Sequence, residues 1–359
     1  MEKKSERALL PDLLRGFAVI LVVFGHCIQE GSGAAYSIEQ QYFDDRLYQF
    51  IYSFHMPLFM MISGYLSWRG IERASERGGW AHLLERRAAS LLTPVFAWTA
   101  LDYVRILIIN SLNGEPQPEA LVFVYFYNAL NNLWFLWAVW WCFLVVLVMH
   151  RFLRDNIGIY VLGFLALFVI PDGLGFGAYK YMLPYFLFGY YMHDCMHRRG
   201  WKLEDMSRAW IVAGTGLVFA GLFLCYDRDA FIYLTGYKLI GKSVKEQLWI
   251  DLYRMLVGFA GSLFFVFLWQ YIVVCFDRIN GTGKMRTGCR VLQKLGADSM
   301  GIYILSGYLL IFLVHRLDFI DHPSYAWNVL ETAAVILLSL CGTVLLGRIP
   351  VLRRLVGKQ

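Results

Sequence analysis

The sequence predicts an all-α integral membrane protein with about ten transmembrane helices in one bundle, and three observations predict it. The 359 residues are 58% hydrophobic and 17% charged, with a mean hydropathy of +0.50, whereas soluble domains are about 45–50% apolar and about 25% charged. Apolar stretches of membrane-spanning length recur along the whole chain. Lys and Arg residues gather in alternate connecting segments.

Ten apolar stretches are the predicted spans. They cover residues 12–30, 47–68, 91–112, 127–149, 157–172, 179–196, 209–226, 249–275, 297–315 and 326–346. The longest connection expected outside, about 227–248, is too short to fold alone. We therefore expect residues 1–359 to form a single transmembrane domain without a separate soluble domain.

The positive charges orient these spans. Of the 33 Lys and Arg residues, 23 fall in the two terminal segments and every second connection, 7 fall in the other connections, and Arg15, Arg105 and Arg254 lie within spans. Positive charge favours the cytoplasmic side, so both termini are predicted to be cytoplasmic. The same asymmetry explains the net charge of +6 without a nucleic-acid partner.

The seven cysteines give no sign of a metal site. No two of them have CxxC spacing, and most lie within apolar stretches. Disulfide frameworks and structural zinc sites need other patterns. We therefore expect neither a disulfide framework nor a metal site. A permanently bound cofactor is not expected either.

The first span, residues 11–30, carries two groups that a bilayer disfavours, Arg15 and His26. At about 100° and about 1.5 Å per residue, eleven steps place them on one helix face, roughly 16 Å apart. Ionisable residues inside a span indicate a functional site, and two on one face indicate a ligand that lies along the helix. The alternatives are a headgroup-anchoring Arg15, a packing His26, and a signal peptide.

The second span contains FHMPLFMMISGY, residues 54–65, in which Pro57 removes a backbone donor and frees a carbonyl. Such a break is tolerated at membrane depth when it is buried in protein or lines a cavity. His55 stands beside it and, like His26, falls in the outer half of the membrane. The two histidines either share one cavity or are unrelated packing residues.

The third span opens with ERRAASLLTP, in which Thr93 and Pro94 are a plausible helix cap and first-turn pair, with Arg86 and Arg87 before them on the cytoplasmic side. These arginines are either ordinary cytoplasmic positive charge or an anion site.

Two acid–base pairs have i,i+3 spacing inside spans, Asp102 with Arg105 and Asp251 with Arg254. We interpret both as structural. Because Arg105 falls near mid-membrane, it is expected to face the bundle interior or water.

Four motifs together resemble the membrane acyltransferase-3 family, and the resemblance covers essentially the whole chain. They are Asp12-Leu13-Leu14-Arg15-Gly16 with His26, FHMPLFMMISGY at 54–65, WFL at 134–136, and Ser299-Met300-Gly301-Ile302-Tyr303. Two positions depart from the family pattern. Ser90 stands where the second member of an Arg-x-x-Arg pair beginning at Arg87 is common, and Ser306 stands where a late histidine is common.

The resemblance implies a bacterial inner-membrane O-acyltransferase that uses acetyl-CoA or another acyl-CoA as co-substrate. The acceptor is a hydroxyl of a cell-envelope polysaccharide or lipid-linked sugar. Arg15, Arg86 and Arg87 would bind the acyl-CoA, since guanidinium groups suit phosphate oxygens. His26 would be the general base, or alternatively the carrier of a covalent acyl group. His55 or Ser306 would stabilise an oxyanion or contact the acceptor.

Two other functions stay open. One is N-acylation of an amino sugar, an amino acid or another small molecule. The other is a transporter or flippase without enzyme activity, because kinked spans with buried charges fit transport as well.

Overall fold

The computed structural model describes residues 9–31, 40–117, 120–153, 158, 176–236, 244–280, 287–314 and 324–358. Apart from Gly158, the predicted fifth span lies outside these residues. Every regular element in the described ranges is helical, which confirms the predicted all-α class.

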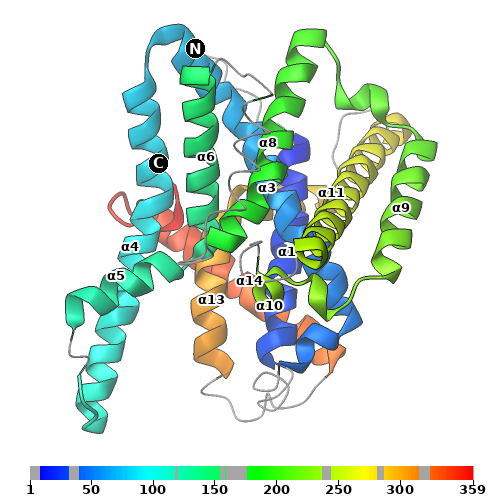
Figure 1. The fold of residues 1–359 in the computed structure, drawn as a ribbon. Coiled ribbons are helices and arrows are strands. Elements are labelled where there is room, and N and C mark those ends of the chain that lie inside the picture. The colour runs from blue at the N-terminus through cyan, green and yellow to red at the C-terminus, as the bar shows by residue number, and fades with distance from the viewer. Residues whose placement is uncertain are drawn as a thin grey trace.

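The α-helices are α1 (Leu9–Gly31), α3 (Arg46–Arg77), α4 (Trp80–Asn113), α5 (Leu121–Asn131), α6 (Trp134–Leu153), α8 (Phe176–Arg199), α9 (Ala209–Leu224), α10 (Ile232–Thr235), α11 (Val244–Asn280), α12 (Thr287–Ala297), α13 (Ser299–Val314) and α14 (Tyr325–Arg348). Short 3₁₀ turns cover Gln41–Asp44, Leu203–Met206, Arg228–Ala230 and Arg353–Val356. The turn between α3 and α4 and the C-terminal ends of α6 and α8 lie at the same end of the bundle, the top of Figure 1.

Several helices have the length and composition of membrane spans. Among the described residues, α1, α4, α6, α11 and α14 meet both criteria. α3 and α8, with 32 and 24 residues, are also longer than the roughly 20 residues that a bilayer core requires. The fold is therefore that of a helical membrane protein, as predicted, while the count of ten spans stays a prediction.

α1 is the central helix. It packs against α3, α11, α12, α13 and α14, and Val19, Val23 and Cys27 on it have no exposed surface. An apolar helix surrounded on most sides by protein leaves its polar residues facing the bundle. The fold thus places the first motif at the centre of the molecule.

Two helix crossings bring backbones into contact. At the first, Gly16 of α1 meets α12, and Gly296 of α12 meets α1; an added Cβ on either would overlap a backbone carbonyl. At the second, Gly64 of α3 and Gly189 of α8 are enclosed in the same way. Small residues allow such close packing of membrane helices, so α1 and α3 are each fixed against a neighbour.

The predicted span 127–149 is in fact two helices, α5 and α6, divided at Asn132 and Leu133. Leu133 has a φ of 49°, a conformation that non-glycine residues rarely adopt. The Asn132 amide donates to the hydroxyls of Thr99 (3.1 Å) and Tyr308 (2.8 Å), which holds the break in place. The WFL motif consequently opens α6.

The prediction that Thr93 and Pro94 cap a helix and form its first turn is wrong, because α4 already begins at Trp80. Pro57 of α3 and Pro94 of α4 both lie inside continuous helices. Packing compensates for the lost hydrogen bonds, since both prolines are buried. Arg86 and Arg87 therefore lie on a helix rather than in a loop.

The two acid–base pairs form as predicted, but in different environments. Arg254 and Asp251 are paired and almost completely buried. Arg105 donates from Nε to Asp102 at 2.8 Å, yet its side chain is 53% exposed. Of the two expected surroundings, the bundle interior or water, the interior is excluded, because this part of α4 lies at the edge of the bundle.

Candidate active site

A cavity of about 140 Å³ lies at the centre of the bundle, between α1, α3, α4, α6 and α13. It is lined by Arg15, Val19, Val22, Met56, Phe59, Ser63, Leu66, Arg87, Leu91, Phe135, Leu136, Val139, Ser299, Met300 and Tyr303. Two cations in an otherwise mostly apolar lining are typical of a site that orients a ligand by a few polar groups.

Each of the four motifs noted in the sequence contributes to this lining. Arg15 comes from the first motif, Ser63 from the second, Phe135 from the WFL motif and Tyr303 from the late motif. The rings of Phe135 and Tyr303 pack edge to face, with centroids 6.0 Å apart. Segments separated by almost 300 residues thus form one cavity, which is the expected arrangement for a functional site rather than for four unrelated packing features.

Arg15 and Arg87 form the charged part of the cavity. The Arg15 guanidinium lies 3.6 Å from the carboxylate of Asp12, which is buried. Arg87 donates to the Ser67 hydroxyl at 3.3 Å and lies over the ring of Phe143, 5.3 Å from its centroid. Both guanidinium groups are oriented by neighbouring side chains and still line the cavity.

Arg86 does not line this cavity. It borders a separate cleft of about 570 Å³ between α3 and α4, and Arg87 borders both spaces. The cavity holds roughly ten times the 10–15 Å³ that one water molecule needs, which suits a slender chain but not a bulky one. The structure therefore divides the three predicted arginines between a narrow cavity and a wider cleft.

His26 lies beyond the end of the cavity lining. Val22, one helical turn before it on α1, is the last α1 residue in the cavity. Gln29 lies next to the His26 imidazole, and His26 and His55 are close enough to interact electrostatically. The structure thus brings the two histidines together, while Arg15 and His26 belong to successive parts of one face of α1.

The hydrogen bond of His55 fixes which ring nitrogen is available. Its Nδ1 lies 2.7 Å from the Ile51 carbonyl oxygen, which can only accept. A neutral His55 therefore carries its proton on Nδ1 and presents Nε2 as an acceptor. Such an imidazole can accept a hydrogen bond from a hydroxyl group, but it cannot donate one to an oxyanion.

Ser306 takes no part in the cavity lining. It is 1% exposed, and its hydroxyl donates to the Tyr303 carbonyl of the same helix at 3.1 Å. Its predicted role at an oxyanion or the acceptor stays a prediction.

Sequence reasoning missed three polar residues near the site. Ser63 and Tyr303 line the cavity, and their membership of two motifs was the available signal. Tyr52 lies edge-on to His55, with centroids 4.7 Å apart, and its ring contacts α1 at Gly25. Its spacing of three residues from His55 on one helix could have indicated this.

Comparison with known proteins gives a family match over nearly the whole chain. The family model described as an acyltransferase domain matches residues 10–348. The nodulation protein NolL of Mesorhizobium japonicum is 25% identical over 333 residues, which cover 90% of this chain and 81% of that protein. NolL of Sinorhizobium fredii is 27% identical over 236 residues, 64% of this chain and 60% of that protein. No solved structure matches.

Proposed function

This chain belongs to the acyltransferase-3 family of membrane acyltransferases, and we propose that it moves an acetyl group from cytoplasmic acetyl-CoA to a hydroxyl of a cell-envelope glycan or lipid-linked sugar. One observation carries the proposal. The four motifs meet in one cavity that is lined by Arg15 and Arg87 and, on α1, reaches Val22, one helical turn before His26.

The arginines support a phosphate-bearing donor. Guanidinium groups bind phosphate oxygens through paired hydrogen bonds, and Arg15 and Arg87 both face the cavity. In this proposal the slender arm of acetyl-CoA passes Arg87 and Arg15 and runs along α1. The thioester then lies near His26.

The proposed reaction is a direct transfer. His26, as general base, takes the proton of the acceptor hydroxyl while the oxygen attacks the thioester carbonyl. The C–O bond forms, the C–S bond breaks, and the proton on His26 passes to the departing CoA sulfur. The products are the acetyl ester and CoA. An acetyl group carried on His26 is the covalent alternative at the same site.

His55 would hold the acceptor rather than stabilise the oxyanion. Its Nε2 is the nitrogen left to accept a hydrogen bond from an acceptor hydroxyl, since Nδ1 is bonded to Ile51. Tyr52, which packs against His55, would place an aromatic ring and a hydroxyl group beside a sugar.

We further propose that both termini and the arginine end of the cavity face the cytoplasm across the bacterial inner membrane. The excess of Lys and Arg in alternate connections supports this orientation, and acyl-CoA is then available on the correct side. A C-terminal reporter that is active only outside the cytoplasm would contradict it.

The proposal is tested with radiolabelled acetyl-CoA and membranes that contain or lack the protein. We expect label in the envelope glycan fraction only when the protein is present, together with a matching mass difference of one acetyl group. Label on an amine would instead show N-acylation. Transport of a glycan without any acetyl transfer would overturn the enzyme proposal.

A further inference from the structure

A second cavity lies between the N-terminal end of α1 and the helices α3, α8 and α11. Its volume is about 390 Å³, more than twice that of the central cavity. The 3₁₀ turn Leu203–Met206 and the two residues before it border one end. Among the described residues no side chain lines both spaces, so the second cavity is separate from the candidate active site.

The side walls of the second cavity are apolar. Leucines come from α1, methionines from α3 and α8, and valines from α11. Methionine side chains adapt their shape to a flexible apolar partner. Such a wall is a poor environment for an ion, but it suits a hydrocarbon chain that enters between the helices from the bilayer.

One polar side chain interrupts this apolar wall. Gln270 of α11 lines the cavity and is only 5% exposed. Its side-chain amide forms no hydrogen bond with any described residue. An amide without a partner in apolar surroundings costs free energy. A ligand that carries an ester or hydroxyl group into the cavity would remove this cost.

Two opposite charges stand at the end formed by the 3₁₀ turn. Lys202 and Glu204, two residues apart, are both exposed and both line the cavity. In the part of the chain that the structure describes, neither side chain forms an ion pair. A zwitterionic group, with an anion and a cation a short distance apart, would match both charges at once.

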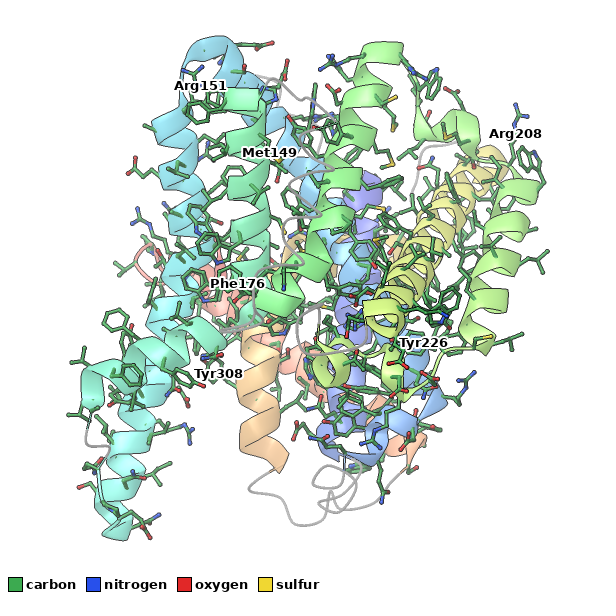
Figure 2. All side chains as sticks on the ribbon, viewed as in Figure 1. Met149, Arg151, Phe176, Arg208, Tyr226 and Tyr308 are labelled. Carbon is green, nitrogen blue, oxygen red and sulfur yellow. The ribbon has the colours of Figure 1, made fainter. Side chains whose placement is uncertain are left out.

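Trp201 indicates that this end lies at the membrane surface. Its ring lines the cavity, is 46% exposed and lies 4.8 Å from the Arg199 guanidinium carbon. Tryptophan beside basic residues is typical of the headgroup region of a bilayer. Figure 2 shows a further arginine, Arg208, at the start of α9 and at this same end of the bundle. The second cavity therefore runs from headgroup level into the apolar layer.

We propose that the second cavity binds one phospholipid with a zwitterionic headgroup and a primary ammonium group, the chemistry of phosphatidylethanolamine. One acyl chain lies between α1, α3, α8 and α11, and an ester carbonyl accepts a hydrogen bond from Gln270. Lys202 pairs with the phosphate and Glu204 with the ammonium, as charge-assisted hydrogen bonds. The inference goes beyond the proposed function and does not depend on acyl transfer.

A lipid in this position would support the wall of the central cavity. Leu14 lines the second cavity and its neighbour Arg15 lines the central one, and the same holds for Ile62 and Ser63 on α3. One helix thickness thus separates the lipid from the candidate active site. Because the lipid would bind the folded bundle, it should stabilise the protein against heat.

The test measures the thermal midpoint and lipid retention of the purified, delipidated chain in neutral detergent. Dioleoyl phosphatidylethanolamine should raise the midpoint with increasing concentration. Native mass spectrometry should show one retained molecule, with about tenfold weaker retention of dioleoyl phosphatidylglycerol or phosphatidylcholine. No rise in the midpoint, or equal retention of the three lipids, would overturn the inference.

Three variants test the headgroup contacts. Lys202→Gln should weaken retention of all three lipids about tenfold, whereas Glu204→Gln should remove the preference for phosphatidylethanolamine over phosphatidylglycerol. Arg208→Gln is the matched control, because Arg208 is an exposed basic residue at the same end that does not line the cavity. Equal losses in Lys202→Gln and Arg208→Gln would show attraction by general positive charge and would overturn the inference.

The variant Gln270→Leu separates lipid binding from folding. Leucine suits the apolar wall and removes the amide that has no partner, so the midpoint without lipid should stay equal or rise. The rise caused by added phosphatidylethanolamine should shrink, because the ester loses its hydrogen bond. A full lipid-induced rise in this variant would overturn the inference.

Discussion

The two ends of the candidate site differ in the interactions that they offer to a ligand. The arginine end combines Arg15 and Arg87 with the open cleft, so its interactions are charged and partly in water. The histidine end consists of His26, His55 and Tyr52, which are held by aromatic packing and hydrogen bonds among neutral groups. In the proposed function, the arginine end therefore binds the donor and the histidine end carries out the reaction. Charge attracts an anion from water, while a dry environment strengthens the few polar contacts near the reacting atoms.

The largest expected effect belongs to His26. Replacing it with Ala or Gln should lower acetyl transfer by about 10²- to 10⁴-fold, the usual loss on removal of a general base. CoA binding should stay normal, because the phosphate contacts lie at the other end of the site. The measurement compares turnover and calorimetric CoA binding in the same preparation.

The Gln variant gives the sharper result for His26. Glutamine can keep a hydrogen bond but cannot take up the proton. Near-normal turnover in His26→Gln would show that His26 only packs, and the two ends of the site would no longer divide binding from chemistry.

Arg15 should show the opposite pattern. Arg15→Ala is expected to weaken acetyl-CoA binding about 10- to 100-fold, with little change in turnover at saturating donor. Arg15→Lys should restore only part of the affinity, because an ammonium group lacks the paired donors of guanidinium. If Arg15→Ala binds acetyl-CoA normally, Arg15 is a headgroup anchor, which leaves Arg87 as the arginine that binds donor in the cavity.

A matched pair of variants tests His55. Asn at this position can keep the hydrogen bond to the Ile51 carbonyl but has no group in place of Nε2, whereas Gln can replace Nε2 but not Nδ1. If Nε2 holds the acceptor, His55→Asn should raise the KM for the acceptor about tenfold, and Gln should recover part of the loss. Full activity of the Asn variant would assign His55 a structural role only.

The smallest expected effect is that of ionic strength. Raising salt from about 0.05 M to about 0.5 M shortens the screening length several-fold, so the KM for acetyl-CoA should rise a few-fold. The turnover at saturating donor should stay nearly constant, because among the described residues none of His26, His55 and Tyr52 forms an ion pair that salt could screen. A salt effect on turnover but not on KM would reverse the assignment of the two ends.

Sequence reasoning reached the features that depend on local periodicity. Arg15 and His26 share one face of α1 because the helix period alone determines it, and the paired spacing of Asp251 and Arg254 likewise follows from i,i+3 geometry. The all-α class followed from apolar length and composition.

The features that sequence reasoning missed depend on tertiary contacts. Pro94 indicates a helix start locally, but packing carries α4 back to Trp80. The outward face of Arg105 is set by how α4 leaves the bundle. The cleft beside Arg86 arises because α4 folds back against α3 after the turn at Gly78 and Gly79, and no periodicity along a single helix reveals that contact.

The two glycine crossings have a consequence for how mutational surveys of this chain should be interpreted. Gly16 and Gly296 hold α1 against α12, and Gly64 and Gly189 hold α3 against α8. Any side chain at these positions would force apart the helices that carry Arg15, His26 and His55. In a saturation scan scored by activity, the four glycines would therefore rank with the reacting residues, although they would touch neither substrate. Only a parallel measurement of protein abundance would distinguish the glycines that pack the helices from the residues that take part in the reaction.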